Sequence, residues 1–159
     1  MPTVFCVGHA VQDFVFSVPV LPDRGEKYRA TGFTSVGGGP AATAAVAVAK
    51  LGARALLAAR VGADAAADMI VAELRGYGVD CSHVRRFDGC ASSVSAVILD
   101  ARGERMIVNN LDPSVPVDAG WLPSPAAVGA QAVLADTRWP EGALAALLAA
   151  RAAGVPAIL

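Results

Sequence analysis

Short apolar runs alternate with helix-length patterns along much of the chain. Val4–Val7, Leu56–Val61 and Ala132–Ala135 are apolar runs of strand length, and Val155–Leu159 begins another. Continuous runs of this kind are typical of strands that are buried on both faces of a sheet. Because helical segments separate them, the pattern predicts an α/β fold with a parallel sheet and crossover helices.

Three segments have the pattern of helices. Ala41–Leu51 is apolar all round, so both of its sides should be covered, and Gly52 ends it. Asp64 is expected to cap the second helix, and the third spans Glu141–Arg151. The spacing predicts inward side chains at Ile70, Leu74 and Tyr77 in the second helix and at Leu144, Leu147 and Leu148 in the third.

Two pairs of segments do not fit this alternation. Apolar residues alternate with others from Phe14 to Val20, and a second extended stretch runs from Lys27 to Val36. Ser93–Leu99 and Glu104–Asn109 flank a turn, as in a hairpin. We therefore expect residues near 14–36 and 93–109 to form a small sheet apart from the parallel core.

Composition and charge exclude some classes of binding partner. Of the 159 residues, 55% are hydrophobic and 17% charged, and the net charge is −1. No basic field favours nucleic acid or an anionic membrane, and no apolar run approaches the ~20 residues of a membrane span. The three cysteines form no CxxC pair, so a reducing, cytoplasmic setting fits best. The two histidines have no metal-ligand spacing, so no metal site is expected.

The last residues stop inside a buried-type strand with no helix after them. An unpaired apolar edge is an aggregation hazard for a self-sufficient domain. The sequence therefore predicts a truncated domain.

The stretch VGGGPAATAA, from Val36, is the most informative motif. Consecutive glycines let the backbone approach a polar ligand closely, and the helix that follows offers free N–H groups at its start. Gly37, Gly39 and Ala42 fit the G-x-G-x-x-A dinucleotide pattern only loosely, since they follow an edge-type strand. The alternative is a tight turn into a buried helix.

In context this stretch resembles the first signature of ribokinase-type (PfkB-type) carbohydrate kinases. Leu51-Gly52, Arg60-Val61-Gly62 and Tyr77-Gly78-Val79-Asp80 match later landmarks, and Gly8 with Asp13 matches an earlier one. The resemblance implies a Rossmann-like α/β core with a small β lid over the sugar, of which 1–159 is the N-terminal part. It also implies that Asp13, Gly38, Gly39 and Thr43 bind substrate, Thr43 standing where the family usually has Asn.

Three segments resemble one branch more closely, the kinases of 6-deoxy-6-sulfofructose. These are VGGGPAATAAVAVAKLGA from Val36, GERMIVNN from Gly103 and VLADTRW from Val133. In that branch Lys, Asn and Arg hold the sulfonate, and they fall on Lys27, Asn109 and Arg138. A point charge, an amide and a guanidinium fork complement an anion with three acceptor oxygens. Asp136, after a core strand, is expected either to touch sugar or to cap the strand end.

The family's Gly-Ala-Gly-Asp motif, which carries the catalytic base, has no match here. We therefore expect the base beyond Leu159, an inactive fragment, and an ATP and Mg²⁺ site that needs the missing half. The parent is expected to be an ATP-dependent kinase that converts 6-deoxy-6-sulfofructose to its 1-phosphate. The alternatives are a ribokinase, fructokinase or nucleoside kinase with a neutral substrate, or a non-catalytic fragment that binds sugar. Exposed lid edges could also pair two copies into a homodimer.

Overall fold

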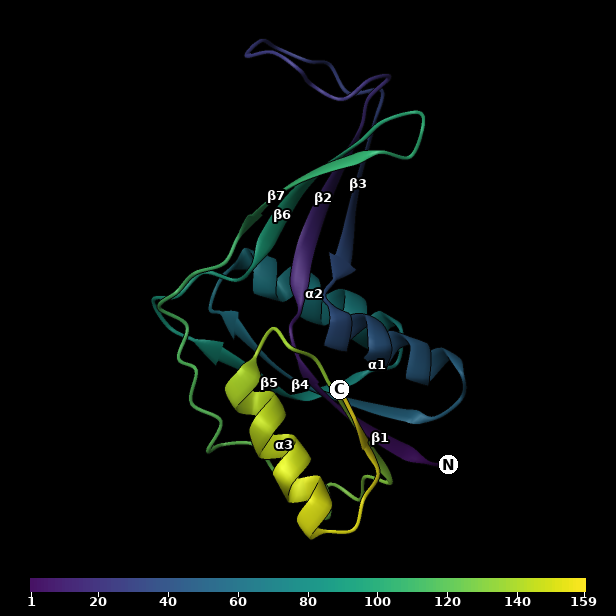
Figure 1. Ribbon diagram of the computed structural model, residues 1–159, viewed down its shortest axis with the longest axis vertical. Helices are drawn as coiled ribbons and strands as arrows, with labels where there is room; N and C mark the ends of the chain where they lie inside the picture. Colours follow the sequence, from purple (N-terminus) through teal and green to yellow (C-terminus); the bar gives the residue numbers. More distant parts are fainter.

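Nine strands form two sheets, one of five strands and one of four, and three helices pack against the larger sheet (Figure 1). A computed structural model describes residues 1–159. None of the three helices has the length and apolarity that a membrane crossing requires. The elements in chain order are β1 (Thr3–Gly8), β2 (Val11–Ser17), β3 (Gly32–Gly38), α1 (Pro40–Lys50), β4 (Arg54–Gly62), α2 (Ala65–Gly76), β5 (Asp80–Phe87), β6 (Val94–Leu99), β7 (Arg105–Asn110), β8 (Ala132–Ala135), α3 (Pro140–Ala152) and β9 (Ala157–Ile158).

The larger sheet has the strand order β5-β4-β1-β8-β9, and every pair in it is parallel. This confirms the predicted parallel α/β core. Strand β5 was not predicted from the sequence pattern. Its pattern is broken by His83, Arg85 and Arg86, since β5 is an edge strand with several exposed side chains.

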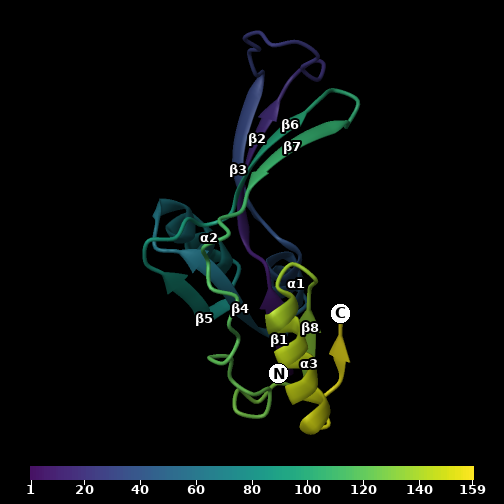
Figure 2. The same ribbon diagram turned by 60° about the vertical axis from the view of Figure 1, so that its left-hand side comes forward.

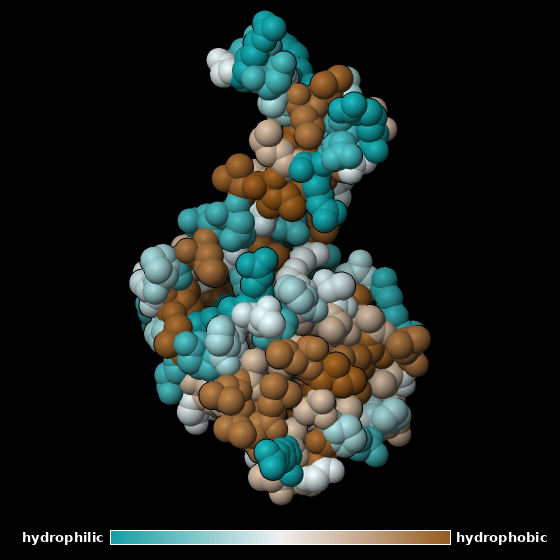
Figure 3. All heavy atoms as spheres, viewed as in Figure 1, coloured by the Kyte–Doolittle hydropathy of each residue, from teal (hydrophilic) through white to brown (hydrophobic).

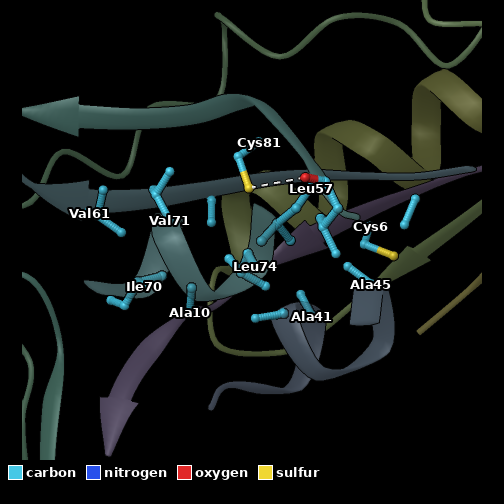
Figure 4. Close-up of a cluster of buried hydrophobic side chains, with 14 of the residues drawn as sticks. Cys6, Ala10, Ala41, Ala45, Leu57, Val61, Ile70, Val71, Leu74 and Cys81 are labelled. Carbon is cyan, nitrogen blue, oxygen red and sulfur yellow. Dashed lines mark hydrogen bonds between the residues drawn. The ribbon is translucent and has the colours of Figure 1, made fainter. Parts of the chain in front are cut away.

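The helices cover both faces of this sheet, as alternation of side chains along β1 shows. Cys6 packs into one buried cluster with residues of α1 and α2, including Ala45, Ile70 and Leu74 (Figure 4). Phe5, on the opposite face of the same strand, packs in a second cluster with residues of α3. The apolar surplus of the sequence is thus used on two faces of one sheet.

The predicted burial of side chains needs correction in each of the three helices. In α3 the buried residues are small (Ala143, Ala146 and Ala150), whereas Leu144 is 60% and Leu148 56% exposed. Alanines let the helix approach the sheet closely, and the leucines point outward. Helix α1 is covered on one side only, because its Thr43 and Ala47 are exposed. Tyr77, which follows α2, is also partly exposed, while Ile70 and Leu74 are buried as expected.

The second sheet has the order β3-β2-β6-β7 and projects from the core (Figure 2). Two antiparallel hairpins meet in it through the parallel pair β2 and β6. The predicted separation of the two strand sets is therefore confirmed. The first hairpin differs in its bounds: β2 ends at Ser17, and 18–31 is a loop at the outer end of the sheet, so β3 begins at Gly32 and not near Lys27.

Candidate functional site

The carboxyl ends of the core strands border a cavity of about 230 Å³ beneath the second sheet. Gly8 and His9 come from the end of β1, Arg60 from β4, and Arg138 from the turn after β8. Ser93, just before β6, closes it from above. Ligands of open α/β sheets bind at this edge, so we take this cavity as the candidate substrate site.

Two guanidinium groups line this cavity. Arg138 makes no side-chain hydrogen bond or ion pair within the chain, although its backbone N–H donates to Asp136 Oδ1 at 2.8 Å. Arg60 Nη1 donates to the carbonyl of Pro116 at 3.0 Å, and its Cζ lies 4.7 Å from the centroid of the Trp139 ring. Burial lowers the pKa of Arg60, against the opposing effect of nearby carboxylates, and a guanidinium stays charged at neutral pH.

Two carboxylates also line the cavity, and only one of them, that of Asp112, accepts hydrogen bonds within the chain. Asp112 lines the cavity, but its carboxylate accepts hydrogen bonds from Ala91 N, Ser114 N and Ser114 Oγ. Glu141, in the first turn of α3, has no ion-pair partner. Burial lowers the pKa of His9, the charge of Asp136 raises it and those of Arg138 and Arg60 lower it. His9 is therefore mainly neutral at neutral pH, and the charged groups that line the cavity are two guanidinium groups and the two carboxylates of Asp112 and Glu141.

One face of the second sheet carries a row of polar side chains at matching positions. Asp13 on β2 pairs with Ser95 on β6, which pairs with Asn109 on β7. Directly opposed residues of neighbouring strands point to the same face. Asn109 Nδ2 donates to Ser95 Oγ at 3.1 Å and, at the same distance, to Ser93 Oγ at the cavity. The predicted residues Asp13 and Asn109 therefore lie on the same face of the second sheet, and the bond from Asn109 to Ser93 connects that face to the cavity.

Asn109 differs from the expectation in one respect. Its amide nitrogen already has three acceptors within the chain, the third being the Val94 carbonyl at 3.1 Å. An amide has only two N–H hydrogens, so a sulfonate would have to displace an existing bond. Asp13, by contrast, makes no side-chain hydrogen bond within the chain, and its carboxylate is free to accept from a sugar hydroxyl.

The glycine turn lies where backbone and side chain approach closely. A Cβ at Gly38 would lie 2.4 Å from Asp13 Oδ2. Gly39 has φ +97°, and a Cβ there would lie 2.4 Å from the carbonyl oxygen of His9. Gly38 therefore leaves room for the Asp13 carboxylate on the neighbouring strand, and Gly39 lets the start of α1 approach the β1–β2 connection.

The expected free N–H groups at the start of α1 are not free. Ala41 N donates to Asp136 Oδ2, Ala42 N to the carbonyl of His9, and Thr43 N to the carbonyl of Gly39. Each of these donors has a partner within the chain. The helix start therefore supports the architecture of the site and offers no open place for an anion.

Thr43 and Lys27 lie elsewhere. The exposed Thr43 lines a different cavity, of about 220 Å³, between α1, α2 and the end of β3, together with Gly38 and Glu73. Lys27 is exposed in the loop 18–31, at the far end of the second sheet from α3 (Figures 1 and 2). The structure therefore does not bring Lys27 together with Asn109 and Arg138 within one chain.

Arg60 and Asp136 are the residues whose place in the site the sequence left unresolved. In the sequence Arg60 was noted only as part of a family motif and was not predicted to line the site. Its position at the end of the core strand β4 could have indicated this role. Asp136 proves to accept bonds from His9 N and Ala41 N as well as from its own turn. The structure contains no group of three or more His, Cys, Asp or Glu side chains that could hold a metal ion.

Comparison with known proteins identifies the family of this chain. A family model described as pfkB family carbohydrate kinase matches residues 1–159, the whole chain. The chain belongs to this family. Among curated relatives, this pfkB-family chain is 31% identical over 108 residues to a ribokinase of Bacillus subtilis (68% of this chain, 36% of the relative). It is 28% identical over 102 residues to a deoxyribokinase of Salmonella typhi (64% and 33%).

Solved structures agree on the fold. A candidate ribokinase from Agrobacterium tumefaciens superposes with a TM-score of 0.92 at 37% identity, over 98% of this chain and 51% of the other. A ribokinase of Arabidopsis thaliana, complexed with ribose and ATP, superposes with a TM-score of 0.81 at 27% identity, over 99% and 52%. The pfkB-family chain thus spans about a third of its curated relatives and half of these solved structures.

Proposed function

We propose that the protein containing this chain is an ATP-dependent sugar kinase, and that the chain supplies its sugar-binding half. Membership of the carbohydrate kinase family supports the reaction class. The ribose and ATP bound by the Arabidopsis ribokinase support the substrate class and the phosphate donor. The second sheet would serve as the lid over the sugar. The catalytic base and the groups that hold ATP and Mg²⁺ would come from residues outside 1–159.

The finer proposal is that the sugar carries an anionic group, as 6-deoxy-6-sulfofructose does, and that it is phosphorylated at the 1-hydroxyl. The observation that carries it is the cavity shared by Arg138, which has no partner, and Arg60. A permanent anion would complement an unpaired guanidinium at the edge of the sheet. Asp13 would accept from a sugar hydroxyl, with the backbone at Gly38 and Gly39 close to the sugar.

Lys27 and Thr43 enter this proposal on separate terms. Since Lys27 lies at the outer loop of its own lid, its contact with the sulfonate requires a second copy to present that loop. The lid has an apolar outer face suited to such a homodimer: Phe14 and Phe16 contact Phe33, with ring centroids 6.3 and 5.0 Å apart. Figure 3 shows brown, hydrophobic side chains along the projecting sheet on the face in view. Thr43 shares its cavity with Gly38, and its contact with the sugar stays a prediction.

A neutral sugar is the second candidate. The amide nitrogen of Asn109 is fully engaged, and Lys27 is remote from Arg138 within one chain. Both observations remove donors from a sulfonate site. The ribokinase and deoxyribokinase relatives point to pentoses. In either case the three free cysteines suit a reducing, cytoplasmic setting.

The deciding experiment assays the full-length protein with ATP and Mg²⁺ on 6-deoxy-6-sulfofructose, fructose, ribose and deoxyribose. A 1-phosphate of the sulfonated sugar, formed with the highest kcat/KM, supports the finer proposal. Preference for a neutral sugar contradicts it and retains the kinase. No phosphorylation of any sugar contradicts both. Residues 1–159 alone should give no turnover above a reaction without protein.

A further inference from the structure

The carboxylate of Asp136 joins three separate segments of the site. Its Oδ2 accepts from His9 N at 2.8 Å and from Ala41 N at 2.9 Å, and its Oδ1 accepts from Arg138 N at 2.8 Å. The residue is 8% exposed. A cap that served only its own strand end would need the last of these bonds alone. The other two connect residues 127 and 95 positions apart in the sequence.

Each bonded segment leads directly to a candidate sugar-binding group. His9 lies in the two-residue connection between β1 and β2, the strand that carries Asp13. Ala41 is in the first turn of α1, just after Gly38 and Gly39. The third segment carries the Arg138 side chain itself.

The end of β1 is shaped to admit this carboxylate. A Cβ at Gly8 would lie 2.3 Å from both Cγ and Oδ2 of Asp136, so no larger residue fits there without displacing it. The negative charge also sits at the start of the 11-residue helix α1, where the helix dipole stabilises an anion. Burial and charge complementarity thus both fix the position of the carboxylate.

We propose that Asp136 is a positioning residue that holds the start of α1, the β1–β2 connection and Arg138 in one arrangement for sugar binding. This inference rests on the proposed function for its effect on sugar affinity. Asp136 fills the start of α1, so the anionic group of a substrate is left to the arginines. With all three of its bonds made to backbone N–H groups, the residue acts through the segments it holds.

The first test is independent of catalysis. In the full-length protein, Asp136→Asn replaces one acceptor oxygen by an N–H₂ group and removes the charge. We expect the backbone amide resonances of His9, Ala41 and Arg138 to move together in NMR spectra. Asp100→Asn is the matched control, because Asp100 is equally buried and accepts from Arg102 N at 2.8 Å and Glu104 N at 2.9 Å, in the β6–β7 turn. It should leave the three amides unchanged.

The second test separates positioning from general loss of structure. Displaced binding groups should raise the KM for sugar by about tenfold, comparable to the loss of one hydrogen bond to a charged group. The KM for ATP should change less than about twofold. A destabilised but correctly arranged enzyme would lose active fraction and keep both KM values, which is the expectation for Asp100→Asn.

The outcomes are distinguishable from those of the proposed function. Unchanged amides in Asp136→Asn would overturn the inference, whether or not the protein phosphorylates sugar. Shifted amides with an unchanged sugar KM would also overturn it, because the joined segments would not set sugar affinity. A wild-type protein without kinase activity would count against the proposed function, and sugar affinity would then be compared by calorimetry, where equal affinities of wild type and Asp136→Asn overturn the inference.

Discussion

Arg60 lies over the face of Trp139, with its guanidinium carbon 4.7 Å from the ring centroid. Trp139 is almost fully buried and stacks on Trp121 with centroids 5.4 Å apart. The indole N–H of Trp139 donates to the Val117 carbonyl at 2.9 Å. The ring therefore fixes Arg60 at the cavity before any ligand binds, which reduces the entropy that binding would cost.

Replacing this ring should destabilise the protein strongly. Trp139→Ala removes a buried aromatic side chain and leaves a cavity, so we expect the free energy of unfolding to fall by about 3–5 kcal/mol. Urea denaturation of the full-length protein measures it. Trp121→Ala is the control, since that ring is only half-buried and should cost less. Equal losses would mean that the two rings stabilise as one unit.

Arg138→Lys tests substrate charge. Lysine keeps the positive charge and loses the planar fork, so the affinity for 6-deoxy-6-sulfofructose should fall about ten- to a hundredfold, or about 1.5–3 kcal/mol. Affinity for fructose should change little. Arg151→Lys, at the exposed end of α3, is the control. Equal losses for both sugars in the Arg138 variant would show that Arg138 has only a structural role.

Mixed dimers test the origin of Lys27. If the loop of one copy reaches the site of the other, Lys27→Ala and Arg138→Ala should each weaken the binding of the sulfonated sugar. Mixtures of the two variants that are refolded together should regain activity. One site of each mixed dimer then combines an intact Arg138 with an intact Lys27. Activity is compared with that of each variant refolded alone. Mixtures with no regained activity would place both residues in the same chain's site, or exclude Lys27 from it.

Gly38→Ala should affect sugar more than ATP. The new Cβ would lie 2.4 Å from Asp13 Oδ2, so the carboxylate must move. We expect a rise in the KM for sugar of about tenfold, comparable to the loss of one hydrogen bond to a charged group. Steady-state kinetics with each substrate varied in turn measures it. Gly25→Ala, in open space in the lid loop, is the control.

The pH dependence of stability should report the cap of α2. Burial alone would raise the pKa of Asp64, but hydrogen bonds from Ser92 and Ala67 and the charge of Arg86 lower it below the ordinary value of 3.8. A carboxyl with a depressed folded pKa stabilises the protein above pH 3.8 and loses that contribution as the pH falls further. Asp64→Ala, which removes the cap, should therefore cost about 0.5–2 kcal/mol at pH 7. Denaturant unfolding should show this difference shrinking below pH 4, and a constant difference would contradict the assignment.

The sequence predicted the core well because burial on two faces leaves continuous apolar runs. β1, β4 and β8 are visible in this way, and so is the separate sheet with its period of two. β5 is hidden because an edge strand tolerates Arg85 and Arg86. In α3 the larger leucines were taken for the core face, whereas close packing against the sheet selects alanine.

The site was predictable one residue at a time and not as an arrangement. Asp13 stands on β2 and Arg138 in the turn after β8, at positions that a motif can mark. The links of Asp136 to residues near the other end of the chain depend on the sheet order, which places β8 beside β1. The separation of Lys27 from Arg138 depends on how far the β2–β3 hairpin extends from the core. Neither property is encoded in local spacing.

The second sheet joins the core through very short connections. Only His9 and Ala10 separate β1 from β2, and Gly39 alone separates β3 from α1. Opening or closing of this sheet would have to be absorbed by backbone rotation at such points, because they are the hinges available on this side. His9 and Ala41 are both tied to the Asp136 carboxylate. Any rotation of the second sheet would therefore disturb the hydrogen bonds to Asp136. Opening of the site and the position of the sugar-binding groups would then change together.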